Sequence, residues 1–194
     1  MTGGEPKSVL ELASSLGALV FGDFLLSSGQ RSTYYFDGRL LTLDPEGAHL
    51  VTKVLLPVIY HYGAEAVGGP TLGADPMVGA MILTSHVEQR PIRGFLVRKA
   101  TKGHGTARLI EGSLAERASK EPPIQVAIVD DTCSTGGNLI SAIEAVENIG
   151  CKVVCVVTIL DRQQGGSKEI RKRGYPFYSI LVADPAGSIT PSSE

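Results

Sequence analysis

Residues 126–138, with the sequence VAIVDDTCSTGGN, join a strand-like apolar run to two carboxylates and a turn of small residues. The side chains of Asp130 and Asp131 can accept hydrogen bonds from the hydroxyl groups of a sugar. The turn behind them precedes a predicted helix, where free backbone N–H groups attract an anion such as a phosphate. The turn consists of Thr132, Cys133, Ser134, Thr135, Gly136, Gly137 and Asn138. The two features side by side predict a site for a ribose 5-phosphate.

A simpler interpretation of the same segment involves no ligand. The two glycines then form only a tight connection from strand to helix, and the two aspartates are a solvated cap. Two other phosphate-binding patterns are missing from the sequence. No G-x-x-x-x-G-K-[ST] stretch is present, and Gly103-His104-Gly105 is followed by Thr-Ala-Arg, which breaks a dinucleotide-binding G-x-G-x-x-G pattern.

Positive charge is concentrated in residues 98–105, RKATKGHG. This stretch contains Arg98, Lys99, Lys102 and His104, and its two glycines give the backbone freedom. Such runs are usually solvated surface segments. The functional alternative is a lid that closes over an anion, with arginine as a planar fork and lysine as a point charge. His104 can then donate a hydrogen bond or, with a pKa near neutrality, a proton.

Two more polar positions follow predicted strands. The turn at residues 69–73 precedes a helix, so backbone N–H groups near Thr71 can bind an anion. Arg162 follows Asp161 at the end of a later strand. It is either a surface arginine paired with that aspartate or a two-donor group for the carboxylate of a ligand.

The elements that must position these residues alternate along the chain. Apolar runs predict five strands, at residues 64–69, 94–99, 125–130, 152–160 and 177–183, with helices between most of them. Strands that are apolar throughout fit a parallel sheet covered on both faces. We therefore predict an α/β fold, an open and mainly parallel five-stranded sheet flanked by helices. Ligands of such sheets bind beyond the carboxyl ends of the strands.

Several helix boundaries can also be predicted. A capping box at Ser8 opens a helix whose apolar face extends to Val20, and residues 21–43 are irregular or hairpin-like. Asp44 is the N-cap of a second helix, which Pro57 should kink or end. Asp75, followed by a proline, is predicted to cap a third helix.

Composition limits the possible functions. The chain has 194 residues and a formal net charge of −2, so phosphate attraction to nucleic acid is not expected to dominate its binding. No apolar run is long enough to span a membrane, and the N-terminus lacks a secretory pattern. The three cysteines, without a C-x-x-C pair, fit buried thiols and no zinc site. We expect a cytoplasmic protein with no nucleic-acid and no membrane partner.

Residues 126–138 resemble the phosphoribosyl-pyrophosphate (PRPP) signature of the type I phosphoribosyltransferases. Three other segments resemble the orotate-using family within that group: GDFLLSSGQRSTYYFD at residues 22–37, RKATKGHG at 98–105 and LDRQQGG at 160–166. The resemblance implies a single domain over residues 1–194. Its core would span about residues 60–185, with a small hood from about residues 1–45 and part of the C-terminal region.

The resemblance also implies what each segment does. The enzyme would transfer the phosphoribosyl group of Mg²⁺-bound PRPP to N1 of orotate, releasing pyrophosphate, in UMP biosynthesis. It would be a homodimer in which residues 98–105 reach the neighbouring subunit's site, and Mg²⁺ would be held mainly through the substrate. The implied catalytic residues are Lys102, His104 and Asp131. The implied PRPP-binding residues are Thr71, Arg98, Lys99, Lys102, His104, Asp130, Asp131 and the turn from Thr132 through Cys133, Ser134, Thr135, Gly136 and Gly137 to Asn138.

The implied orotate-binding residues are Ser134, Arg162, Tyr35, Phe36 and Ser27. Tyr35 and Phe36 are either hood core or a slot for the flat base. Two positions depart from the family pattern, because Ser27 and Gly73 stand where many or some members have lysine.

Two other functions remain compatible with the sequence. A phosphoribosyltransferase for a purine would share the PRPP signature but not the segments around Arg162 and residues 21–37. A non-catalytic sensor of PRPP would need a basic DNA-binding module, which is not visible at this net charge.

Overall fold

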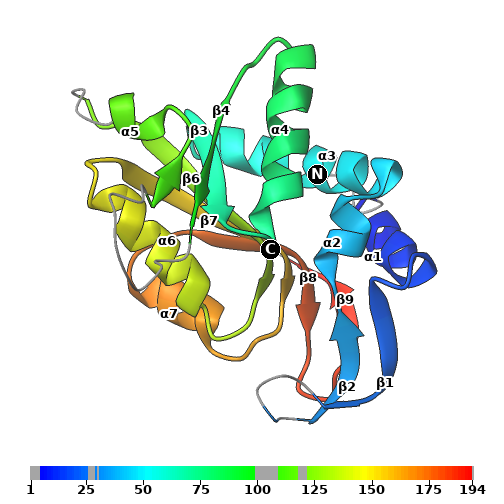
Figure 1. Ribbon diagram of the computed structural model, residues 1–194. Helices are drawn as coiled ribbons and strands as arrows, with labels where there is room; N and C mark the ends of the chain where they lie inside the picture. The colour runs from blue at the N-terminus through cyan, green and yellow to red at the C-terminus, as the bar shows by residue number, and fades with distance from the viewer. Residues whose placement is uncertain (1–4, 26–28, 30, 99–108, 118–121, 194) are drawn as a thin grey trace.

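The structure is a computed structural model, and it describes residues 5–25, 29, 31–98, 109–117 and 122–193. Its main element is a seven-stranded sheet in the order β5-β4-β3-β6-β7-β8-β9 (Figure 1). Five adjacent strands are parallel: β4 (Arg93–Val97), β3 (Ala66–Pro70), β6 (Gln125–Cys133), β7 (Lys152–Asp161) and β8 (Phe177–Ala183). These are the five strands that the apolar runs predict.

The number of strands is larger than predicted because each edge of the sheet carries one more. β5 (Ile110–Glu111) pairs antiparallel with β4, and β9 (Ile189–Pro191) pairs antiparallel with β8. With two and three residues, these edge strands are too short to show a hydrophobic period. The prediction of a mainly parallel sheet is confirmed, but the sheet has seven strands instead of the predicted five.

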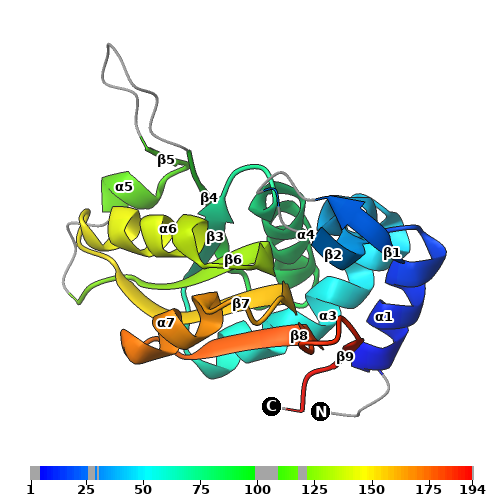
Figure 2. The same ribbon diagram turned by 90° about the horizontal axis from the view of Figure 1, so that it is seen from below.

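Helices cover both faces of the sheet (Figure 2). Alternate side chains of β6 point to opposite faces. Ala127 and Val129 belong to the apolar cluster that includes α3 (Pro45–His61) and α4 (Ala74–Val87). Val126 and Ile128 belong to a second cluster with α6 (Gly137–Glu147) and α7 (Gly166–Lys172). Burial on both sides explains why the central strands are apolar throughout. The short helix α5 (Leu114–Arg117) lies near β5.

The N-terminal part packs at one end of this core. It consists of α1 (Glu5–Ser15), an antiparallel hairpin of β1 (Leu19–Leu25) and β2 (Arg31–Phe36), and α2 (Gly38–Thr42). The hairpin that the glycine-rich, aromatic stretch suggested is present, with a register shift between Phe21 and Phe24. We call these four elements the hood, while the predicted division of the chain into hood and core stays a prediction.

Three details of the predicted helices are wrong. Ser8 lies inside α1, which begins at Glu5, and the helix ends at Ser15, so Val20 belongs to β1. Gly17 has a positive φ of 70°, which ends the helix although the apolar pattern continues to Val20. The predicted Asp44 cap of α3 is confirmed. α3 continues through Pro57 to His61, so the proline does not end the helix, and a kink there stays a prediction. α4 begins at Ala74 with Gly73 as N-cap, so Asp75 lies in the first turn.

Among the described residues, no helix has the length and apolar character needed to cross a bilayer.

Candidate functional site

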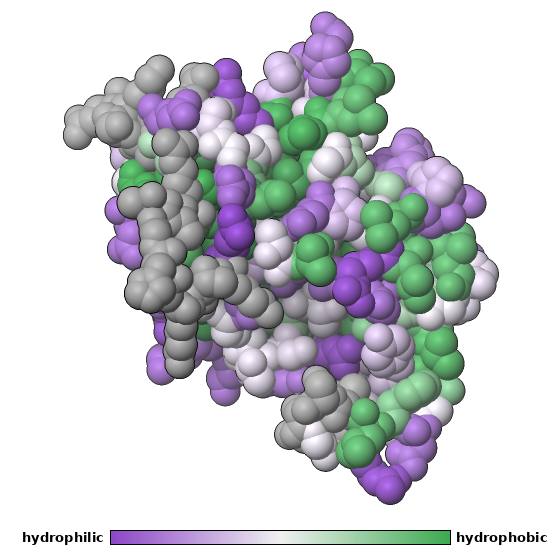
Figure 3. Space-filling model, viewed as in Figure 1, coloured by the Kyte–Doolittle hydropathy of each residue, from purple (hydrophilic) through white to green (hydrophobic). Residues whose placement is uncertain are grey.

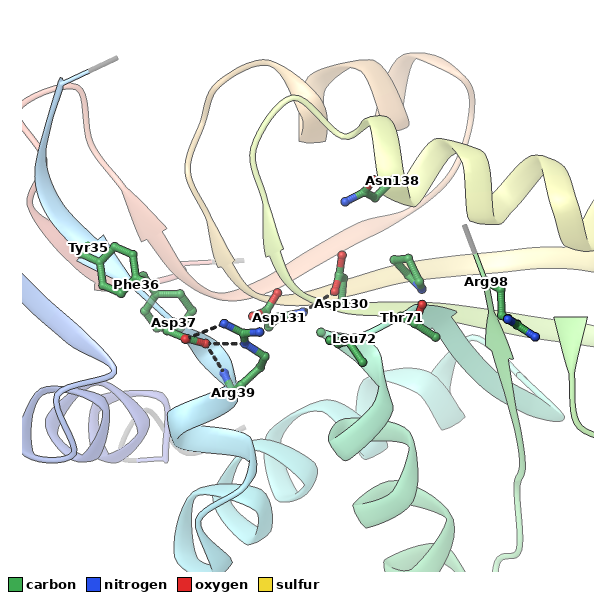
Figure 4. A pocket seen from close by; sticks show the side chains of 12 residues that line it. Tyr35, Phe36, Asp37, Arg39, Thr71, Leu72, Arg98, Asp130, Asp131 and Asn138 are labelled. Atoms are coloured by element: carbon green, nitrogen blue, oxygen red, sulfur yellow. Dashed lines mark hydrogen bonds and ion pairs between the residues drawn. The ribbon is translucent and has the colours of Figure 1, made fainter. Parts of the chain in front are cut away.

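A cavity of about 610 Å³ opens at the carboxyl ends of the central strands (Figure 4). β3 contributes Pro70, β6 contributes Asp130 and Asp131, and Arg98 follows β4. The hood forms the opposite wall. The complete lining is Tyr35, Phe36, Asp37, Arg39, Pro70, Thr71, Leu72, Gly73, Arg98, Asp130, Asp131 and Asn138. This is the place in an open α/β sheet where ligands bind.

The two adjacent aspartates stand at the base of this cavity. Asp130 is 7% exposed, and its carboxylate accepts a 3.0 Å hydrogen bond from the backbone N–H of Asp131. Burial, and then the neighbouring charge of Asp131, raise the pKa of Asp130. The pKa of Asp131 is also raised, by burial and by Asp37, while Arg39 lowers it. Among the described residues, no cation forms an ion pair with Asp130 or Asp131. Hydroxyl donors or a bound cation would therefore stabilise these two neighbouring carboxylates.

Replacing Asp130 should reveal the energetic cost of this pair. Because the native pKa lies above that of the unfolded chain, the native state binds the proton more tightly, and stability falls as pH rises through that interval. Asn keeps the acceptor for Asp131 but carries no charge. One pKa unit corresponds to about 1.4 kcal/mol, so we expect Asp130→Asn to be more stable than wild type by about 1–3 kcal/mol at neutral pH.

Urea unfolding of both proteins across a pH series provides the measurement. The difference in unfolding free energy should shrink as the pH falls and approach zero below about pH 3, where Asp130 is protonated in both states. A difference that is the same at every pH would contradict the assigned cost of the charge.

The predicted phosphate turn encloses a smaller cavity of about 180 Å³ beside the first. Asp130 and Asn138 line both cavities. The remaining lining is Thr132, Ser134, Thr135, Gly136, Gly137 and Leu139. The turn leads directly into α6, whose first backbone N–H groups have no partner within the helix. The geometry is that of an anion site opening into a larger chamber.

Two glycines give the turn its shape. Gly136 has φ of 82°, a conformation that favours glycine, and it is the N-cap of α6. Gly166, the first residue of α7, packs under the turn and donates its N–H to the carbonyl of Ser134 at 3.0 Å. A Cβ on Gly166 would lie 2.5 Å from the Gly136 nitrogen. Sequence reasoning placed Gly166 only in a segment for orotate.

Cys133 contributes to the turn from beneath. Its side chain is fully buried and lines neither cavity. Burial, with the charges of Asp161 and Asp130 adding to it, raises the pKa of the thiol to about 12. This fits the expected buried, unreactive thiol, and any contact of Cys133 with a phosphate would come from its backbone.

The hood wall contains a pair of charged residues that sequence reasoning missed. Asp37 is the N-cap of α2, and its carboxylate accepts two hydrogen bonds from the Arg39 side chain, each 2.8 Å long. Gly38 lies between them against the acid pair, because a Cβ there would be 2.6 Å from the Cβ of Asp131. No period or motif marks these residues, and only an aspartate before a short helix hints at them.

The wall that faces the hood contains the predicted anion-binding turn. Thr71, Leu72 and Gly73 line the cavity between β3 and α4, and the Thr71–Leu72 peptide bond is cis. Gly73 approaches the acid pair closely, since a Cβ there would lie 2.3 Å from Asp130 Oδ1. Arg98 lines the same cavity, and its Nη1 atom is 3.1 Å from Glu111 Oε1.

The predicted orotate residues do not all line one cavity. Tyr35, 41% exposed, and the buried Phe36 line the large cavity, whereas Ser134 lines the small one. Arg162 lines a separate cavity of about 340 Å³, together with residues 31–34 of β2. Its Nη2 atom is 3.4 Å from the Phe36 carbonyl oxygen, and its guanidinium lies 5.2 Å from the centre of the Tyr34 ring. Asp161 accepts a hydrogen bond from the Gln163 N–H.

Four predicted residues lie outside the described residues: Ser27, Lys99, Lys102 and His104. The residues that flank the basic segment are described. β4 and β5 pair through Leu96 and Glu111, and the Arg98 N–H donates to the Leu109 carbonyl at 2.7 Å. The described residues on either side of 99–108 are therefore held side by side.

Comparison with known proteins identifies the family. Residues 79–180 match the phosphoribosyl transferase domain family. The orotate phosphoribosyltransferase of Aquifex aeolicus is 40% identical over 158 residues, which cover 81% of this chain and 83% of the relative. That of Streptomyces avermitilis is 42% identical over 174 residues, covering 88% and 91%.

A solved structure agrees with these relatives. The crystal structure of Mycobacterium tuberculosis orotate phosphoribosyltransferase in complex with PRPP superposes with a TM-score of 0.72 at 32% identity, covering 92% of this chain and 96% of that one. Shared sequence, a shared fold and a phosphate turn beside an acid pair lead to one conclusion: the chain belongs to the orotate phosphoribosyltransferase family and is a phosphoribosyl-transferring enzyme.

Proposed function

We propose that this chain transfers the 5-phosphoribosyl group of PRPP to N1 of orotate, giving orotidine 5′-phosphate and pyrophosphate, as in UMP biosynthesis. The observation that carries the proposal is the position of Asp130, which lines both the phosphate-turn cavity and the larger one. A ribose bound at this junction can place its 5-phosphate in the turn and its reacting carbon in the larger cavity.

The roles of the residues follow from this placement. Backbone N–H groups at the start of α6 hold the 5-phosphate, and Asp130 and Asp131 accept hydrogen bonds from the ribose 2- and 3-hydroxyls. Orotate N1 attacks the sugar from the face opposite pyrophosphate, with inversion. The negative charge of the acid pair also favours the oxocarbenium-like sugar as the leaving group departs. Most of the acceleration then comes from positioning and electrostatics.

The residues at the site fit a Mg²⁺ ion that arrives with the substrate. Among the described residues no group of three or more His, Cys, Asp or Glu could hold a metal, so the described residues form no protein cage. The acid pair offers carboxylate oxygens beside the cavity, and magnesium is commonly held by one or two carboxylates together with substrate phosphates. When bound, Mg²⁺ neutralises the charge that develops on pyrophosphate.

A homodimer is part of the proposal. Several large apolar side chains are exposed on α2 and the residue after it, on α4 and on the turn before α4: Leu40, Leu43, Leu72, Leu83 and Val87. Figure 3 shows hydrophobic side chains on the face where these helices lie. An exposed apolar surface of this kind is typical of a protein–protein interface. Light scattering coupled to size-exclusion chromatography should give twice the monomer mass. Exchange of residues 98–105 between subunits and a cytoplasmic location stay predictions.

The reaction is tested by offering three bases separately. Orotate, uracil and hypoxanthine are each incubated with PRPP and Mg²⁺ while ultraviolet absorbance follows consumption of the base. We expect rapid loss of orotate alone, with stoichiometric release of pyrophosphate. Consumption of hypoxanthine would indicate a purine enzyme. Binding of PRPP without any turnover would indicate a sensor.

A further inference from the structure

The charged residues that line the large cavity are unevenly distributed. Its floor is formed by Asp130 and Asp131, while a pyrophosphate bound there would carry several negative charges of its own. Gly73 stands at a position where some family members have lysine, and a Cβ there would lie 2.3 Å from Asp130 Oδ1, so a side chain would require the acid pair to shift. Among the described lining residues, only Arg39 and Arg98 are cations.

We propose that Arg39 is a further substrate-binding residue, whose guanidinium binds the pyrophosphate group of PRPP. The inference rests on the proposed reaction, which brings PRPP to this cavity. If the 5-phosphate occupies the turn at the start of α6, the opposite end of the substrate extends into the larger cavity. There Arg39 and Arg98 stand on either side of the turn at Thr71 and Leu72 (Figure 4).

The guanidinium is oriented before any ligand arrives. Asp37 binds its Nε and Nη2 atoms in the fork geometry, and the Asp37 carboxylate also accepts the backbone N–H of Arg39 at 3.1 Å. Nη1 takes part in neither bond to Asp37 and is available to a ligand. The side chain is 47% exposed, so it is neither buried nor free in solvent. Holding a rotamer-rich side chain in place lowers the entropy that binding costs.

The hood thereby supplies a second cation to the cavity, in addition to Arg98 after β4. Arg39 follows Gly38, which packs against Asp131, so the arginine is fixed relative to the acid pair. A bidentate donor suits phosphate oxygens better than a single point charge does. Arg39 would also limit repulsion between the incoming anion and the two carboxylates.

The test compares ligands that contain pyrophosphate with one that does not. Calorimetry with inorganic pyrophosphate plus Mg²⁺, and separately with orotidine 5′-phosphate, is carried out on wild type, Arg39→Ala and Arg39→Lys. We expect Arg39→Ala to weaken pyrophosphate binding and to raise the KM for PRPP by about 10- to 100-fold, with affinity for orotidine 5′-phosphate changed by less than about threefold. Arg39→Lys should recover part of the loss, because it keeps the charge without the fork.

Arg173→Gln is the matched control. Arg173 also bonds to carboxylates, those of Glu144 and Glu169, and lies outside the two site cavities. This variant should bind pyrophosphate as wild type does. If Arg39→Ala lost affinity equally for pyrophosphate and for orotidine 5′-phosphate, the arginine would only orient Asp131. If only the KM for orotate rose, the arginine would contact the base instead of pyrophosphate. Either result overturns the proposal, whereas absence of orotate-dependent turnover in wild type would overturn the proposed function instead.

Discussion

Asp131→Asn should lower kcat/KM for PRPP by about 100-fold or more while leaving the fold intact. The substitution keeps the size of the side chain but removes the charged acceptor for a ribose hydroxyl, and a hydrogen bond to a charged group is worth about 1.5–3 kcal/mol. The negative charge that favours the oxocarbenium-like sugar is lost as well. Steady-state rates of orotate consumption at varied PRPP provide the measurement.

Stability separates this loss of activity from unfolding. Burial raises the pKa of Asp131, so a neutral amide should not destabilise the native state. Asp44→Asn serves as the control, because Asp44 caps α3 through the N–H groups of Glu46 and Gly47 and asparagine caps a helix equally well. Wild-type kcat/KM in Asp131→Asn, with an active parent enzyme, would remove this carboxylate from the site.

Gly166→Ala is expected to damage PRPP binding from a distance. The new Cβ would lie 2.5 Å from the Gly136 nitrogen and 2.6 Å from the Ser134 carbonyl oxygen, both of them backbone atoms of the phosphate turn. The turn has to shift, and its N–H groups then no longer converge on one point. We expect the KM for PRPP to rise about 10- to 100-fold, and stability to fall by about 1–3 kcal/mol from overpacking.

Calorimetric titration with PRPP well below the melting temperature checks this effect without interference from unfolding. Gly79→Ala is the matched variant, because Gly79 lies within α4 with no atom within 4 Å of an added Cβ. That change should leave binding untouched and stabilise the protein by about 0.4–1 kcal/mol. Unaltered PRPP affinity in Gly166→Ala would show that the turn does not depend on its packing against α7.

The sequence predicts those parts of the site that a short segment builds alone. β6, its terminal aspartates and the turn before α6 are consecutive, so one apolar run, two acids and two glycines are enough to place them. The five parallel strands are predicted for a related reason, since burial on both faces makes each of them apolar. The sequence does not predict the short edge strands, because two or three residues are too few to show a hydrophobic period. It also misplaces helix ends, because a glycine at positive φ can end a helix early.

Tertiary structure alone decides which distant residues share a cavity. Asp37 and Arg39 reach the acid pair only because the hood folds over the carboxyl ends of the strands, where Gly38 has no Cβ to collide with Asp131. On the other wall, Gly73 allows the turn before α4 to approach the same aspartates. Arg162, which the family resemblance associates with orotate, lines a different cavity together with residues 31–34 of β2. The residue types of a chain determine which chemistry it can perform, because charge and hydrogen-bonding capacity belong to each side chain by itself. Which of those groups act together depends on long-range packing, which no local pattern of residues encodes.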